Sequence, residues 1–134
     1  MKIGLIGLST FPTPPPIHTG DIVIYHLGLS LEEMGHEVTF YAPAGSWIPA
    51  SGGLREMHCS WGTNNPTMWD AEQACYDRWR ADLLAEDVVH DFSQYKRVAE
   101  NLLAAGRTNV VSTLLGGTWE HPDPALNIVV WSKA

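Results

Sequence analysis

Hydrophobic positions recur along this chain in two patterns, which predict strands and helices in turn. Short apolar runs bounded by glycine or proline are typical of buried strands, and apolar residues at helical spacing are typical of amphipathic helices. Strands are expected at residues 2–8, 36–42, 54–59, 87–92, 109–115 and 127–131. Helices are expected at residues 22–34, 67–85 and 95–105. This alternation predicts an α/β fold with a mostly parallel, doubly wound sheet.

The first strand and the loop after it are expected to form the binding edge of this sheet. The strand leads into a loop that contains four prolines, so the loop is neither helix nor central strand. Gly20 and Asp21 then open the first helix, with Asp21 as its cap. In open α/β sheets, ligands lie at the carboxyl ends of the strands. We therefore expect a ligand close to Gly20.

The first helix has a predicted apolar side and a predicted end. The apolar side is expected at Val23, Leu27, Leu31 and Met34, which recur at helical spacing. Gly35 follows as a residue that can take a positive φ and end the helix. A strand, a helix and a strand in close succession predict a right-handed parallel crossover.

The composition fits one folded domain that spans residues 1–134. The chain is 45% hydrophobic and 17% charged, with a net charge of −7 and an isoelectric point near 5.2. This negative charge argues against a nucleic acid or an anionic membrane surface as the main partner. No apolar stretch approaches the roughly 18 residues of a membrane span. The two cysteines, Cys59 and Cys75, do not indicate an oxidising compartment, so a cytoplasmic location is expected.

Six segments, taken in order, carry a resemblance to a known enzyme family. They are Met1–Ile6, the proline-rich loop with Gly20, the Gly-His-Glu-Val-Thr run at 35–39, Asp87–Asp91, Val110–Leu114 and Val129–Ala134. Together they resemble the N-terminal half of GT-B glycosyltransferases of family 4, the retaining group that uses nucleotide sugars. The Gly-His-Glu-Val run is the most specific single piece, and the resemblance covers nearly the whole chain.

The resemblance implies a Rossmann-like, three-layer α/β/α domain that binds the acceptor in a hexose transfer. It also implies a second domain, which binds most of the donor nucleotide and carries a carboxylate pair. Residues 1–134 contain no counterpart of that domain, so this chain alone is expected to be inactive, with its catalytic residues unassigned. The implied partners are a nucleotide sugar, a hydroxyl acceptor, and either a separate donor-domain chain or a second copy. No cofactor is expected.

Two positions depart from the family's pattern. The family usually has two glycines at the start of the first helix, where backbone N–H groups meet the donor phosphate, whereas this chain has Thr19 and Gly20. The family often has a histidine at the position of Leu115, and leucine neither donates a hydrogen bond nor carries charge. Leu115 and the missing second domain favour an alternative function, a non-catalytic module that binds a sugar, a nucleotide or a protein on the same fold.

The loop before the first helix holds the first group of candidate substrate-binding residues. Backbone N–H groups at Thr19 and Gly20 can bind a phosphate, helped by the helix dipole. The plainer alternative is an ordinary helix start with Asp21 as its cap. His18 either shapes the acceptor pocket or is a solvated loop residue.

The ends of two later strands hold the second group. His90 and Asp91 are expected to face one hollow beside Gly20, where a histidine next to a carboxylate can orient a sugar hydroxyl or act as a base. The alternative is a histidine bound to the backbone. Gly116 and Trp119 follow the strand over 109–115, and Trp119 either stacks on a sugar ring or packs within its loop.

A metal site is not expected at this edge. The residues that could combine to form one are His18, Asp21, His90 and Asp91. Their spacing does not match any known metal-binding motif.

Overall fold

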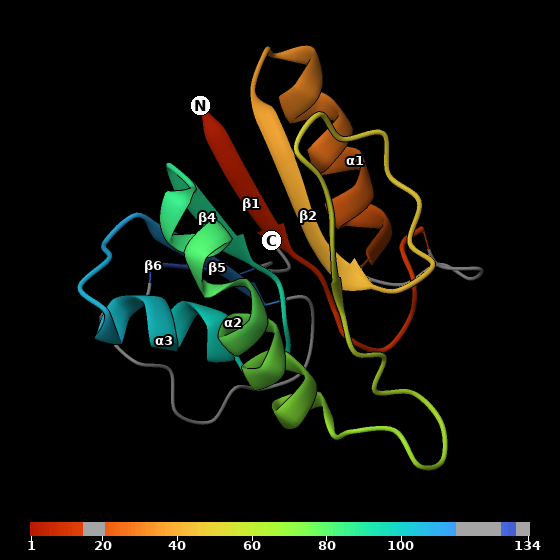
Figure 1. Ribbon diagram of the computed structural model, residues 1–134. Helices are drawn as coiled ribbons and strands as arrows, with labels where there is room; N and C mark the ends of the chain where they lie inside the picture. The colour runs from red at the N-terminus through yellow and green to blue at the C-terminus, as the bar shows by residue number, and fades with distance from the viewer. Residues whose placement is uncertain (15–20, 115–126, 131–134) are drawn as a thin grey trace.

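The computed structural model describes residues 1–14, 21–114 and 127–130. In these residues the strands are β1 (Lys2–Ile6), β2 (Glu37–Pro43), β3 (Gly53–Met57), β4 (Val88–Asp91), β5 (Val110–Leu114) and β6 (Asn127–Val130). The helices are α1 (Asp21–Glu33), α2 (Met68–Ala85) and α3 (Arg97–Ala104). The strands form one sheet in the order β3-β2-β1-β4-β5-β6, as Figure 1 shows. Each neighbouring pair is parallel, which confirms the predicted α/β class.

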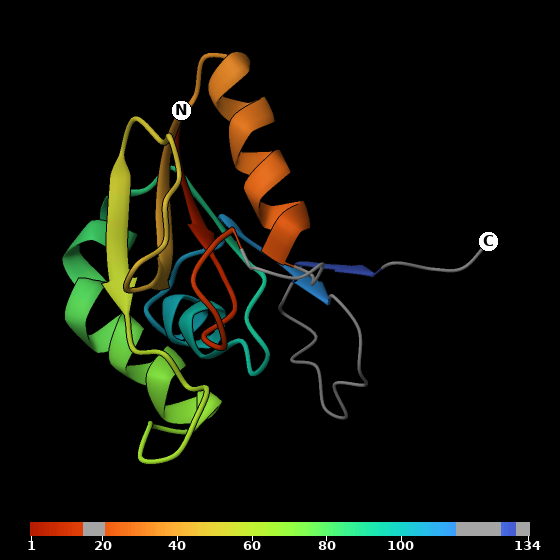
Figure 2. The same cartoon turned by 90° about the vertical axis from the view of Figure 1, so that its right-hand side faces the viewer.

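The helices cover both faces of the sheet and give three layers. Figure 2 shows α1 on one side of the strands and α2 with α3 on the other. The predicted Rossmann-like α/β/α arrangement is therefore confirmed. The strand order reverses direction between β1 and β4, and such a switch point is where open α/β sheets place their ligands.

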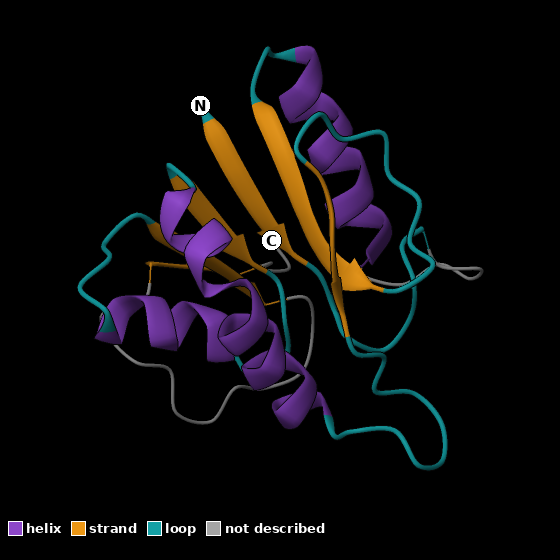
Figure 3. Cartoon of the chain, in the orientation of Figure 1, coloured by secondary structure: helices purple, strands orange, loops and turns teal. Residues whose placement is uncertain are grey.

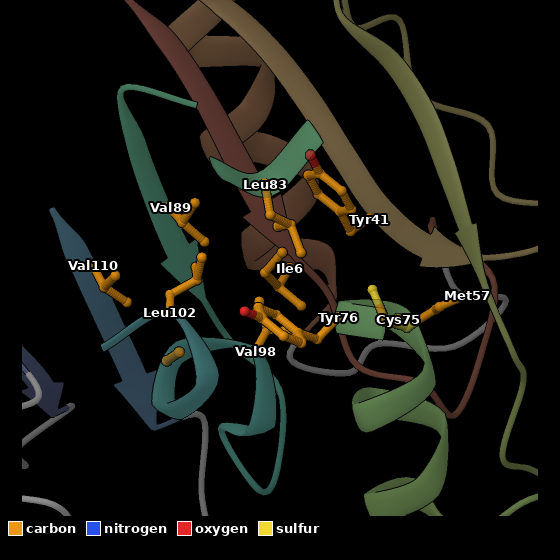
Figure 4. Close-up of a cluster of buried hydrophobic side chains, with 11 residues drawn as sticks. Ile6, Tyr41, Met57, Cys75, Tyr76, Leu83, Val89, Val98, Leu102 and Val110 are labelled. Carbon is orange, nitrogen blue, oxygen red and sulfur yellow. The ribbon is translucent and has the colours of Figure 1, made fainter. Parts of the chain in front are cut away.

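The larger core lies between the sheet and the two helices α2 and α3. Figure 4 shows Ile6, Tyr41, Val89 and Val110 of the sheet pointing toward side chains of the two helices. The helical members of this cluster are Cys75, Tyr76, Leu83, Val98, Ala99 and Leu102. Cys75 is a core residue there, and burial raises the pKa of its thiol well above the ordinary range.

The smaller core lies under α1, where the helix backbone comes very close to the sheet. A Cβ atom built on Gly28 would lie 2.4 Å from the ring of Phe40, so only glycine fits at this contact. Ile24 is fully buried beside it. Burying such a side chain contributes roughly 2 kcal/mol.

The predicted apolar side of α1 is wrong at one of its two ends. Leu27 and Leu31 pack against the smaller core as expected, whereas Met34 lies just past the end of the helix and is 71% exposed. Ile24 and Gly28 take the central positions instead. The sequence pattern allows either side of the helix, and the close approach at Gly28 decides which one meets the sheet.

Three loops after strands β1, β2 and β3 are joined at the carboxyl edge of the sheet. Ser60 donates its backbone N–H to the carbonyl oxygen of Ser9 at 2.8 Å, and the hydroxyls of the same two residues are 2.9 Å apart. Trp47 donates its backbone N–H to the carbonyl oxygen of Thr13 at 2.7 Å. Figure 3 shows these connections as teal loops beyond the arrowheads. In the described residues, no helix is long and apolar enough to cross a membrane.

Candidate functional site

The start of α1 meets the end of β1 at the switch point. The helix begins at Asp21 itself, one residue earlier than predicted, and this carboxylate is fully buried. Its Oδ1 accepts a hydrogen bond from the backbone N–H of Leu8 at 3.3 Å. Asp21 therefore fixes the turn after β1 against the first turn of the helix.

His90 lies at the carboxyl end of β4 on the face covered by α1. Its ring stacks on Phe92, with the ring centroids 4.1 Å apart, and its Nε2 lies 2.7 Å from the hydroxyl oxygen of Thr113 on β5. Burial lowers the pKa of His90 to about 4, against a weaker opposing effect of Asp91. The imidazole is therefore neutral at pH 7 and can both donate and accept a hydrogen bond.

Asp91 lies on the opposite face, and the prediction that it shares a hollow with His90 is wrong. Its Oδ2 accepts from the backbone N–H of Ala99 in the first turn of α3, at 2.9 Å. Its Oδ1 accepts from the backbone N–H of Ser93 at 2.8 Å. The reason is geometric, because successive side chains of a strand point to opposite faces of the sheet. Asp91 is fully buried and anchors α3.

Glu72 is a buried carboxylate on α2 that the sequence analysis missed. Its Oε1 lies 2.8 Å from the hydroxyl oxygen of Ser93, and the carboxyl group accepts hydrogen bonds from the backbone N–H groups of Tyr95 and Arg97 at 3.1 and 3.3 Å. Burial and the charge of Asp91 raise its pKa to about 7. A signal was present in the sequence, because Glu72 stands four residues from Tyr76 along an apolar side of the helix.

Lys96 completes this buried group. It is fully buried, with a left-handed backbone (φ 56°) just before α3. Its Nζ donates to the carbonyl oxygens of Asp91 and Thr113 at 3.0 and 2.7 Å, which ties the ends of β4 and β5 together. Burial lowers the pKa of its ammonium group, against the opposing charges of Asp91 and Glu72. Lys96 thereby holds β4 and β5 in the register that brings Thr113 to His90.

Exposed aromatic side chains gather at the same edge. The large apolar side chains that remain exposed in the described residues are Met1, Met34, Trp47, Trp61, Trp69 and Tyr95. The four aromatic ones follow the carboxyl ends of strands, whereas the two methionines lie at the opposite end. Exposed aromatic rings on one edge mark a binding surface more often than scattered single ones do.

Two of these rings are held in place by neighbours. Arg97 stacks its guanidinium 4.2 Å from the centre of the Trp69 ring, and Tyr95 meets the same ring at 5.7 Å. Trp61 packs against Phe11, with the ring centroids 5.1 Å apart. A ring that is exposed and held in one orientation is ready to stack on a ligand without further ordering.

Several predicted site residues lie outside the described residues. They are His18, Thr19, Gly20, Leu115, Gly116 and Trp119. Their roles in substrate binding stay predictions. In the described part of the chain, no group of three or more histidine, cysteine or acidic side chains is placed to hold a metal ion.

Comparison with known proteins adds no further assignment. No family model matches this chain, and no curated protein matches it.

Proposed function

We propose that this chain is the acceptor-side domain of a GT-B glycosyltransferase of the family 4 type. Such an enzyme transfers a hexose from a nucleotide sugar to a hydroxyl acceptor. One observation carries the proposal: three segments of the resemblance fall on strands of one Rossmann-like sheet. The Gly-His-Glu-Val-Thr run leads from the end of α1 into β2, Asp87–Asp91 covers β4, and Val110–Leu114 is β5. The sheet has its switch point beside β4.

The neutral imidazole of His90 is the described side chain best suited to bind an acceptor hydroxyl. With Nε2 beside Thr113, its other ring nitrogen is the one left to bind a ligand. Because its pKa is about 4, His90 is a weak base, and we assign it to hydrogen bonding and orientation instead of proton removal. Trp61 and Trp69 offer flat faces for the apolar side of a sugar ring.

Donor binding belongs to a second domain in this proposal. That domain is supplied by the same polypeptide or by another chain, and residues 1–134 alone bind the acceptor without transfer. The departure at Leu115 leaves the contact with the reacting sugar to a neighbouring group. The proposal keeps the cytoplasmic location expected from the composition, where nucleotide sugars are the donors.

A non-catalytic binding module is the second candidate, and Asp91 favours it. The carboxylate expected to work beside His90 is instead fully buried and serves the first turn of α3. The same edge would then bind a sugar, a nucleotide or a protein without chemistry. The two candidates share the fold and differ in whether a donor site joins this edge.

A ligand panel tests the proposal on this chain. Binding of methyl glycosides and of nucleoside diphosphate sugars is measured by saturation-transfer NMR and by thermal shift. We expect glycosides to bind, and we expect His90→Gln to weaken that binding by about 10-fold, the effect of one lost hydrogen bond. His26→Gln, which changes an exposed histidine on α1, is the matched control and leaves binding unchanged.

The other outcomes separate the candidates. Binding of nucleotide sugars that His90→Gln does not weaken supports the binding module. Absence of binding by any glycoside contradicts an acceptor site at this edge.

A further inference from the structure

The buried residues Glu72, Ser93 and Asp91 present a problem of hydrogen counting. The hydroxyl oxygen of Ser93 lies 2.5 Å from Asp91 Oδ1 and 2.8 Å from Glu72 Oε1. A hydroxyl has one hydrogen to donate, and an ionised carboxylate only accepts. Two ionised carboxylates would leave one of these short contacts without a hydrogen. The geometry therefore requires a further proton in the group.

We infer that Glu72 carries this proton and donates it to Ser93, which in turn donates to Asp91. The proton chain then runs from α2 through the 92–96 turn to β4. It makes the turn at the carboxyl edge sensitive to pH in the neutral range. This inference does not depend on the proposed function.

The hydrogen-bond partners identify Glu72 as the protonated member. Each oxygen of Asp91 accepts a backbone N–H at 2.8 or 2.9 Å, from Ser93 and Ala99, as an ionised carboxylate requires. The backbone N–H groups lie farther from Glu72, that of Tyr95 at 3.1 Å and that of Arg97 at 3.3 Å from Oε1, which keeps a lone pair for this long contact when protonated. The N–H of Tyr95 lies 3.1 Å from both of its oxygens, so Oε2 can accept this bond while Oε1 carries the proton.

The charge balance points the same way. Lys96 is the buried cation of the group and compensates one carboxylate, with its Nζ bound to the carbonyl oxygens of Asp91 and Thr113. Arg97 also adjoins Glu72, but its guanidinium is directed to Gln73 and Glu100.

One further titratable group lies close on α2. Cys75 is buried three residues along the helix, and its raised thiol pKa keeps it neutral. With Glu72 protonated, the ionised members are therefore Asp91 and Lys96, and the buried group has no net charge. The raised pKa of Glu72, about 7, agrees with this arrangement.

Ionisation of Glu72 weakens the folded state. A carboxyl group whose pKa is higher in the folded than in the unfolded chain makes stability fall as the pH rises between the two values. For Glu72 this window runs from its ordinary value of 4.5 to about 7. Above it, two buried carboxylates face one lysine, and the turn that links β4 to α3 is expected to loosen.

A titration of the unaltered protein tests the inference directly. The carboxyl carbon of Glu72 is followed by ¹³C NMR between pH 3 and pH 9, with the exposed Glu33 as internal control. We expect Glu72 to titrate near pH 7, well above its ordinary value of 4.5. A midpoint for Glu72 at or below that ordinary value overturns the inference.

A variant separates the shared proton from a purely structural role. In Glu72→Gln the side-chain amide donates to Ser93 permanently, so it reproduces the protonated state. We expect its urea midpoint to equal that of the unaltered protein at pH 5 and to exceed it at pH 8. Glu33→Gln should shift neither comparison.

Equal losses of stability in Glu72→Gln at both pH values would overturn the inference. If Glu72→Gln does not fold, the titration of the unaltered protein still shows whether Glu72 carries the proton. In Asp91→Asn, the neighbouring negative charge is lost. The pH at which Glu72 titrates should therefore fall.

Discussion

The two faces of the sheet differ sharply at the carboxyl end of β4. On the α1 side, His90 is half-buried, neutral and bound to one hydroxyl, that of Thr113. On the side of α2 and α3, Asp91 is fully buried and accepts bonds from Ser93 and Ala99. Neighbouring residues of one strand thus have different tasks. His90 stays partly exposed, and Asp91 fixes the start of α3 behind it.

This contrast teaches where polar residues at a binding edge can be expected to act. A carboxylate at the end of a parallel strand is not a ligand-binding group when a helix N-terminus beneath the sheet takes its oxygens. Asp91 acts in this way for α3, and Glu72 adds a second carboxylate to the same helix start. Substitutions on the two faces should therefore separate stability from binding.

The largest expected effect is on the scaffold side. Asp91→Ala removes the acceptor for Ala99 and the carboxylate that the buried ammonium of Lys96 faces in the folded chain. The free energy of unfolding should fall by about 3 kcal/mol or more. Asp87→Ala is the control, because Asp87 lies just before the same strand and accepts one exposed backbone N–H, that of Lys2, at 2.7 Å. It should cost less than about 1 kcal/mol in urea unfolding, and similar losses for both variants would erase the contrast.

An intermediate effect is expected on the α1 side, at its closest contact. Gly28→Ala places a methyl group against the ring of Phe40 and forces the helix away from the sheet. The cost should be about 1–3 kcal/mol in urea unfolding. A double variant with Phe40→Leu should recover part of this loss, because a smaller side chain makes room for the methyl group. If the double variant lost as much stability as the two single variants together, the clash between residue 28 and the Phe40 ring would not be the cause of the loss.

The smallest effect on stability is expected at His90 itself. Its pKa is lower in the folded chain, so its neutral form stabilises the protein above about pH 6.5, and that contribution is lost as the pH falls toward 4. Because the ring is partly exposed, the loss should be at most about 2 kcal/mol. His90→Gln should remove this part of the acid dependence of the urea midpoint. An unchanged acid dependence would mean that His90 already titrates normally.

The boundaries of the elements could be predicted closely wherever local signals were strong. Thr67 begins α2 as a cap, with its hydroxyl oxygen accepting the N–H of Asp70 at 3.1 Å, and Gly35 takes a φ of 90° just after α1. The start of α3 was placed too early, at Tyr95 instead of Arg97. The cause is Lys96, a residue type that seldom adopts the left-handed backbone and so gives no signal of a turn.

The candidate site was less predictable than the fold. His90 and Asp91 were correctly placed at the end of a strand, but which neighbours would take their polar atoms depends on segments far away in sequence. Glu72 meets Ser93 across 21 positions, and Lys96 meets Thr113 across 17. Neither pairing follows a periodic pattern.

The sequence by itself determined the alternation of strands and helices, the parallel sheet and the edge at which His90 and Asp91 lie. Periodicity, glycine and proline act over a few residues, so short stretches of sequence are enough to predict these features. Only the tertiary structure decided that Asp91 is covered while His90 stays accessible, and that Glu72 joins Asp91 through Ser93. The physical reason is that burial and hydrogen-bond partners belong to the packed layers, which bring together side chains from α2, β4 and the turn before α3.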